Sequence, residues 1–163
     1  MSISIILGVV CLIALILWFR RRNTPAYPPL NVEADHPLML KAIEKARATT
    51  DKFLSLYYDG EHDCQVKIPF ETNSGEIEHL WAAVQQIKND SLSLLYLTPP
   101  VSHSGKIDRE HTHLLSKIED WAVFTEEGKI YGGYTQRVMF DLAREQWGEL
   151  PPELAEQESN YVT

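Results

Sequence analysis

The chain has 163 residues, 44% of them hydrophobic and 23% charged, which suits one domain with a buried core. Its formal net charge is −8, from 15 basic and 23 acidic residues. Three of the basic residues are the adjacent arginines at 20–22, so the rest of the chain has 12 basic residues against 23 acidic ones. Such an acidic surface repels phosphate backbones and argues against nucleic acid as a partner. Of the two cysteines, Cys11 lies in an apolar segment and Cys64 in the polar remainder, so no disulfide is expected.

The apolar segment, residues 2–19, is predicted to be a transmembrane anchor in contact with membrane lipid. A helix of this length rises about 27 Å, at about 1.5 Å per residue, close to the thickness of a bilayer's hydrocarbon core. Trp18 stands where an interfacial aromatic residue is expected, and Arg20, Arg21 and Arg22 follow directly as a stop. The predicted anchor region is therefore residues 1–22.

A cleaved secretory signal is the competing interpretation of this segment. Such a signal needs basic residues before the apolar stretch and small residues at its end, and neither is present. Val9 and Val10 likewise disfavour a lipoprotein site at Cys11, because that site needs small residues. The positive-inside rule keeps the three arginines in the cytoplasm, so the rest of this single-pass protein is expected to be cytoplasmic.

Residues 23–34 contain three prolines and no hydrophobic period, which predicts a short extended spacer. A helix is expected over 36–56, because Asp35 can cap its first turn and Pro37 needs no hydrogen-bond partner there. Apolar residues in this range, including Ala46 and Phe53, recur at helical spacing on one face.

After Gly60 the hydrophobic period changes to two, which is typical of strands. Strands are expected over 66–70, 76–88, 92–97, 113–124 (with room for a break near Lys117) and 130–134, separated by turns at 73–75, 89–91 and 126–128. Gly128 is expected to take the left-handed position of a hairpin loop. A helix over 134–147 completes a predicted soluble α+β domain, residues 35–148. An acidic flexible tail is expected over 149–163.

Six stretches of the sequence, taken in order, carry a family resemblance. They are HPLM at 36–39, AIEKAR at 42–47, VKIPF at 66–70, GEIEHLW at 75–81, IEDW at 118–121 and GGYT at 132–135. Together they resemble the YegJ-like bacterial family, the domain of unknown function 2314, over roughly residues 35–138. The resemblance implies a helix packed on an antiparallel sheet and brings no established activity, and it does not extend to the anchor.

Candidate site residues fall into two groups around tryptophans. On a strand, Glu76 and Glu78 share one face while His79 and Trp81 share the other, so a general acid or base could stand beside an aromatic wall. The alternative is a polar sheet face in which His79 is simply hydrogen-bonded. His111 and His113 could bind a divalent metal with His103, although no recognised zinc motif is present and no metal site is expected.

The second group lies on both sides of the Gly128 hairpin. Asp120 and Trp121 precede it, and Gly132-Gly133-Tyr134 follow, so an aromatic pair beside a carboxylate could form a recognition patch. The alternative places Trp121 and Tyr134 in the core. Since Trp121 and Asp120 point to opposite faces of a strand, we expect Trp121 in the core and Asp120 at the surface.

These features predict a membrane-tethered, non-enzymatic protein-interaction domain at a bacterial inner membrane, with no cofactor. The candidate interaction residues are Glu78, His79, Asp120, Trp121 and Tyr134. The acidic surface suits a basic protein partner, and tethering raises the local concentration of such a domain near membrane partners. Two alternatives stay open: an immunity-type protein that neutralises a toxin, and a metal-dependent hydrolase that uses His79, His111 and His113.

Overall fold

The computed structural model describes residues 27–33, 35–60 and 62–162. The chain divides into two compact units, residues 1–31 and 32–163, and the first is described only over residues 27–31. The predicted anchor at 2–19 and its flank, Trp18, Arg20, Arg21 and Arg22, lie outside the described residues. Within the described ranges no helix is both long and apolar enough to cross a bilayer. Residues 27–33 of the predicted spacer form neither helix nor strand.

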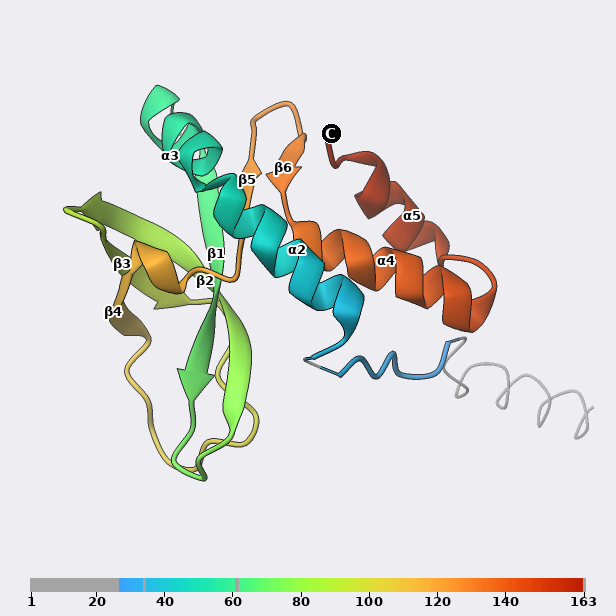
Figure 1. Cartoon of the computed structure of the whole chain (residues 1–163), viewed down its shortest axis with the longest axis horizontal. Coiled ribbons are helices and arrows are strands. Elements are labelled where there is room, and N and C mark those ends of the chain that lie inside the picture. Colours follow the sequence, from blue (N-terminus) through green and yellow to red (C-terminus); the bar gives the residue numbers. More distant parts are fainter. Residues whose placement is uncertain (1–26, 34, 61, 163) are drawn as a thin grey trace, which may run out of the picture. The chain divides into compact units, whose positions relative to one another are not determined.

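The second unit is built on one antiparallel sheet of six strands in the order β4-β3-β2-β1-β5-β6 (Figure 1). The strands are β1 (Asp63–Glu71), β2 (Ile77–Lys88), β3 (Ser91–Tyr96), β4 (Glu110–Leu114), β5 (Asp120–Phe124) and β6 (Ile130–Gly132). The predicted α+β class is therefore confirmed for this unit. The stretch 113–124, expected to be strand with room for a break near Lys117, is divided at that point: residues 115–117 form a short 3-10 helix between β4 and β5.

Tight turns set the register of the sheet where the sequence predicted them. Asn89 and Asp90, both at positive φ, form the two-residue connection between β2 and β3. Gly128, at φ 77°, closes the hairpin between β5 and β6, and its N–H donates to the Thr125 carbonyl. In each case a residue that tolerates left-handed backbone stands where two strands reverse.

Two helices replace the single helix predicted over 36–56: α2 (Pro37–Ala48) and α3 (Thr50–Asp59). The chain breaks at Thr49, which leaves helical backbone at φ −112° and ψ 18°. Its hydroxyl bonds the carbonyls of Lys45 and Ala46, at 2.9 and 3.1 Å, and so competes with the backbone N–H groups that would continue the helix. The cap at the start is His36 rather than Asp35, because His36 Nδ1 accepts the Leu38 N–H.

The flexible tail predicted from residue 149 is wrong as well. After α4 (Tyr134–Trp147), residues 152–159 form the helix α5 (Pro152–Ser159). Beyond it Tyr161 pairs with Ile130 in a parallel bridge, so the end of the chain covers the open edge of β6. Composition suggested a solvated tail, but these backbone hydrogen bonds depend on an edge strand about thirty residues earlier.

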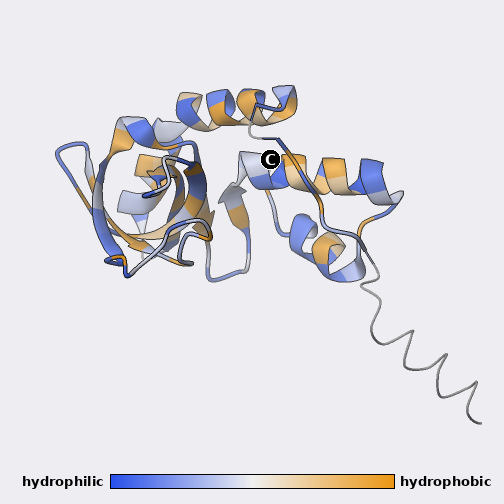
Figure 2. Ribbon diagram, turned by 90° about the horizontal axis from the view of Figure 1, so that it is seen from below, coloured by the Kyte–Doolittle hydropathy of each residue, from blue (hydrophilic) through white to orange (hydrophobic). Residues whose placement is uncertain are grey.

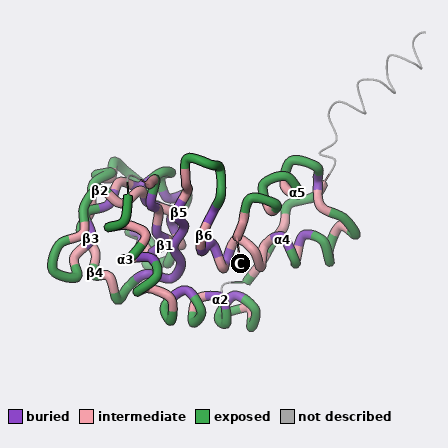
Figure 3. The backbone as a smooth tube through the Cα atoms, turned by 90° about the horizontal axis from the view of Figure 1, so that it is seen from above, coloured by how far each residue is buried: buried purple, intermediate pink, exposed green. Residues whose placement is uncertain are grey.

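The hydrophobic core lies between α2, α3 and one face of the sheet. Ala46 and Phe53 are completely buried against Val66 and Trp121, and the Phe53 and Trp121 ring centroids are 5.7 Å apart. Among the strands, β5 is the most completely buried, since residues 120–123 are all buried (Figure 3). The helices carry hydrophobic and hydrophilic residues in alternation, as amphipathic helices do (Figure 2). Each fully buried large apolar side chain stabilises such a core by about 1.5–3 kcal/mol.

Candidate functional site

Asp120 is the hub that joins the sheet to α4. Its carboxylate is completely buried and accepts four hydrogen bonds, from the N–H groups of Trp121, Tyr134 and Thr135 and from the Thr135 hydroxyl, at 2.7–3.1 Å. Three of these donors belong to the first turn of α4, so β5 caps a helix that follows it by ten residues. Burial raises the pKa of Asp120, against the lowering effect of these hydrogen bonds.

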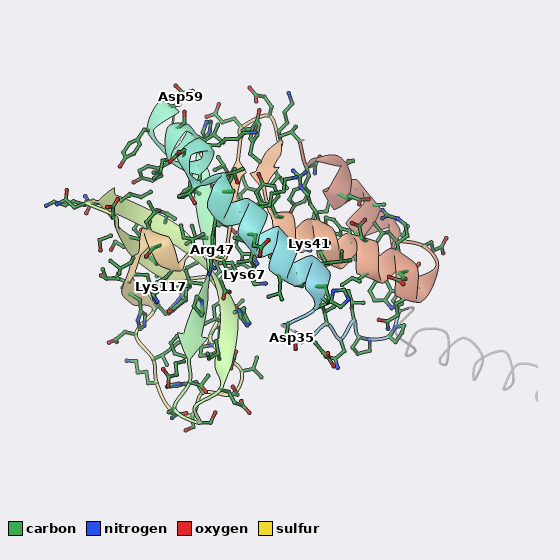
Figure 4. All side chains as sticks on the ribbon, viewed as in Figure 1. Asp35, Lys41, Arg47, Asp59, Lys67 and Lys117 are labelled. Atoms are coloured by element: carbon green, nitrogen blue, oxygen red, sulfur yellow. The ribbon has the colours of Figure 1, made fainter. Side chains whose placement is uncertain are left out.

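The prediction that Asp120 lies at the surface is therefore wrong. Asp120 and Trp121 do point to opposite faces of β5, as the strand period requires, but α4 covers the second face at this position. Lys67, labelled in Figure 4, is paired with Asp120 in the register of β1 and β5, and its charge interacts with the buried carboxylate. Burial lowers the pKa of Lys67, while Asp120 and Glu119 oppose that shift.

Trp121 belongs to the core, as predicted. It is completely buried, and its indole N–H donates to the Ala46 carbonyl at 3.0 Å and to the Thr49 hydroxyl at 3.2 Å. Tyr134 packs edge-on against it, with ring centroids 5.8 Å apart, and also bonds Thr49. Trp121 and Tyr134 are thus neighbours across the hairpin, and together they fasten the end of α2 to the sheet.

The glycine pair between β6 and α4 makes that packing possible. A Cβ on Gly132 would lie 2.1 Å from the Trp121 carbonyl oxygen, and one on Gly133 would lie 2.4 Å from the Tyr161 ring. Both residues also have positive φ. The pair therefore serves a tight turn and close packing, and the turn leads directly into the cap at Asp120.

His79 and Glu78 take separate roles on the two faces of β2. His79 Nδ1 lies 2.6 Å from Glu119 Oε2, and Nε2 makes no hydrogen bond to any residue that the structure describes. Glu78 accepts hydrogen bonds from the backbone of Val101 and Ser102 and from the Ser102 hydroxyl. These bonds lower the pKa of Glu78, the Ser102 hydroxyl contributing most. Glu78 therefore holds a loop, and His79 is a part-exposed imidazole paired with a carboxylate.

His111 and His113 on β4 join an aromatic cluster with Tyr96 on β3. His113 Nε2 bonds the Tyr96 hydroxyl at 3.1 Å, and His111 Nε2 lies 2.6 Å from the Asp108 carbonyl oxygen. The Nε2 atoms of both histidines are thus engaged with the protein. Burial and the neighbouring His111 lower the pKa of His113, which keeps it neutral near pH 7. No group of three metal-ligating side chains occurs among residues 27–33, 35–60 and 62–162.

A groove of about 270 Å³ opens on the sheet face opposite α2 and α3. We call it the outer groove. Its walls come from β1, β2, β5, α4, α5 and the segments that follow β3 and α5, and all its lining side chains are uncharged. They are Gln65, Trp81, Leu97, Thr98, Ala122, Phe124, Gln136, Gln157 and Tyr161.

The sequence pointed to only one wall of this groove. Trp81 was expected on the strand face opposite Glu78, and its position on that face is confirmed by the pairing of β2 with β1. Gln136, Gln157 and Tyr161 carried no signal, because they lie on helical or terminal segments that approach the sheet only after folding. The alternation of polar Gln65 with buried Val66 could have placed Gln65 on the face of Trp81.

The fold and the groove together define a small α+β domain with an uncharged cleft on an antiparallel sheet. The chain belongs to the family described as "Uncharacterized protein conserved in bacteria (DUF2314)", which matches residues 36–148. It is 32% identical over 103 residues to "Uncharacterized protein YegJ" of Escherichia coli (strain K12), an alignment that covers 62% of this chain and 66% of that relative. No solved structure matches the chain.

These comparisons confirm the family resemblance expected from the sequence. The match ends at residue 148, before α5, so Gln157 and Tyr161 of the outer groove lie beyond the family's matched range.

Proposed function

We propose that this protein is a membrane-tethered domain that binds another protein in its outer groove and catalyses no reaction. The observation that carries the proposal is the groove itself: seven parts of the fold converge there, and they present aromatic and carboxamide side chains without a charge. Such lining suits an uncharged stretch of polypeptide, since a charged ligand would lose its hydration without a countercharge.

The other candidate residues support structure rather than catalysis. Asp120 caps α4, Trp121 and Tyr134 anchor α2, and Glu78 holds the loop at Val101. His79, which pairs with Glu119, lies on the sheet face of Trp81, two residues from it along β2.

The tether is supported by the sequence of residues 2–22. Eighteen residues that are apolar except for Ser2 and Ser4, followed by three arginines, suit an anchor whose following domain stays in the cytoplasm. There the domain would meet membrane-associated partners at raised local concentration.

The orientation is tested with reporters fused after Thr163. A reporter active only in the cytoplasm should give a strong signal, and one active only in the periplasm should give none. Changing Arg20, Arg21 and Arg22 to serine should weaken this preference for the cytoplasmic orientation, because positive charges beside an anchor keep that flank on the cytoplasmic side. A periplasmic signal from the unmodified chain would contradict the proposed topology, and a soluble chain after cell fractionation would contradict the tether.

The binding site is tested by photo-crosslinking in cells. A photoreactive phenylalanine replaces Leu97 at the groove or, as the control, Tyr58 on α3. Both are large exposed residues, with exposed fractions of 41% and 68%. We expect a discrete adduct from position 97 and none from position 58. The adduct should disappear when Gln136→Ala and Gln157→Ala are added. Both substitutions should leave the domain folded, because replacing a solvent-accessible polar side chain that has no partner costs little stability. Equal adducts from both positions, or an adduct indifferent to the glutamines, would reject the groove as the binding site.

A further inference from the structure

The outer groove holds several hydrogen-bond donors that the protein itself leaves unused. Among the described residues, Trp81 Nε1, the Tyr161 hydroxyl and the carboxamides of Gln136 and Gln157 form no hydrogen bond. The Trp81 and Tyr161 polar atoms are also not sealed from solvent. A polar group that a ligand desolvates must find a partner on that ligand, so each of these donors calls for an acceptor there.

Two of these groups favour an acceptor on the ligand. An indole N–H has no acceptor lone pair, so Trp81 requires an acceptor. Burial, with the Asp120 carboxylate, raises the pKa of Tyr161 to about 12 despite the opposing charge of Arg137, so its hydroxyl stays protonated and neutral. Gln65 donates one amide N–H to Asp63, at 3.2 Å, which leaves its carboxamide oxygen and its second N–H for the groove.

The aromatic rings of the groove are likewise available to a ligand. Neither Trp81 nor Phe124 has a ring partner among the described residues, and both are only partly buried. Tyr161 is fixed on its other side by Phe140, at 5.7 Å between ring centroids, and by the Arg137 guanidinium. Three rings from β2, β5 and the segment after α5 therefore offer flat apolar surface beside the donors.

A proline-rich segment meets these requirements closely. Its polyproline II helix has no internal hydrogen bonds, so its carbonyls are free acceptors, and its prolines have no N–H that would need a partner. Its rings pack on aromatic side chains, and the conformation is formed before binding, which reduces the entropy cost. A neutral oligosaccharide also stacks on aromatic rings, but its hydroxyls are donors as well as acceptors and its chain lacks the preformed row of free carbonyl acceptors; it is therefore the competing ligand in the test below.

We infer that the outer groove binds an uncharged, proline-rich segment of a partner protein in the polyproline II conformation, with Trp81, Gln136, Gln157 and Tyr161 donating to its carbonyl oxygens. This inference rests on the proposed protein-binding function and names the chemistry of the partner. It also assigns a specificity role to the C-terminal segment, because Gln157 and Tyr161 lie outside the family's matched range.

The test uses the full chain in lipid nanodiscs and a fluorescent probe peptide of repeated Pro-Pro-Ala, with both ends blocked. Fluorescence anisotropy should report saturable binding, and a Gly-Ser peptide of the same length should not bind. Trp81→Phe keeps a ring but removes the donor, and Gln157→Ala removes a carboxamide. Each should weaken binding about three- to tenfold, the loss of roughly one hydrogen bond. Gln86→Ala, an exposed glutamine of β2 outside the groove, is the matched control and should change nothing.

Equal binding of the Gly-Ser peptide, or weakening by Gln86→Ala as large as by Gln157→Ala, would overturn the inference. So would the absence of peptide binding, or binding of a neutral oligosaccharide in its place. In those cases an adduct from position 97 that depends on the glutamines would still uphold the proposed function. Loss of both the adduct and the peptide binding would reject the two together.

Discussion

Replacing Trp121 with alanine is expected to lower the free energy of unfolding by about 3–5 kcal/mol, the largest effect that we predict for a single substitution. The side chain is completely buried between Phe53, Tyr134 and the sheet, so truncation leaves a cavity. It also leaves the Ala46 carbonyl at the end of α2 without its indole donor. Because domains of this size are stable by only about 5–15 kcal/mol, the variant should be partly unfolded at physiological temperature.

Urea unfolding of the full chain in nanodiscs, followed by near-ultraviolet circular dichroism, measures this loss. Trp121→Phe is the matched comparison, since it keeps an aromatic ring in the core but loses the two hydrogen bonds to Ala46 and Thr49. It should cost clearly less than the alanine variant. An unchanged urea midpoint for Trp121→Ala would show that this side chain does not hold α2 on the sheet.

Asp120→Ala is expected to lower the free energy of unfolding by about 3 kcal/mol, through lost hydrogen bonds and unsatisfied donors. The change removes four hydrogen bonds at once and leaves the N–H groups of Trp121, Tyr134 and Thr135 without their acceptor in the protein interior. The first turn of α4 also loses the carboxylate that caps it. We therefore expect α4 to open before the rest of the domain, with faster amide hydrogen exchange at Tyr134 and Thr135.

Two variants separate the cap from a general effect of burial. Thr135→Ala removes only the hydroxyl bond to Asp120 and should cost about 1 kcal/mol. Asp120→Asn keeps the shape and one acceptor oxygen but turns a donor toward Thr135, so its cost should lie between the other two. If Asp120→Ala cost no more than Thr135→Ala, the carboxylate would not be the hub that joins β5 to α4.

Trp121 and Asp120 also show the limit of what a strand pattern predicts. Alternation placed Trp121 and Asp120 on opposite faces, and that is correct. The further step, from opposite face to solvent, failed because α4 packs over the second face and supplies the donors that a buried carboxylate needs. The period of a strand predicts only the face of the sheet to which a side chain points. Whether that face is solvent or protein interior depends on which other element packs over it.

Local signals in the sequence determined the elements and most of their ends. Asn89-Asp90 and Gly128 placed two hairpins because positive φ is a property of a residue and its neighbours, and Pro37 placed the start of α2 for the same reason. The helix break at Thr49 was missed. Its hydroxyl bonds two carbonyls of its own helix, but it also accepts from Trp121, seventy-two residues away, and that contact exists only after folding.

Only the tertiary structure decided the outer groove and the place of the C-terminal segment. Residues 149–162 look like a solvated tail in composition, yet the open edge of β6 offers Ile130 N–H and carbonyl groups to Asn160 and Val162. That pairing carries Gln157 and Tyr161 to the sheet face of Trp81. The sequence by itself determined the family and the antiparallel α+β core, because their signals are short-range. The groove arises from hydrogen bonds and packing between distant segments, for which no local pattern exists.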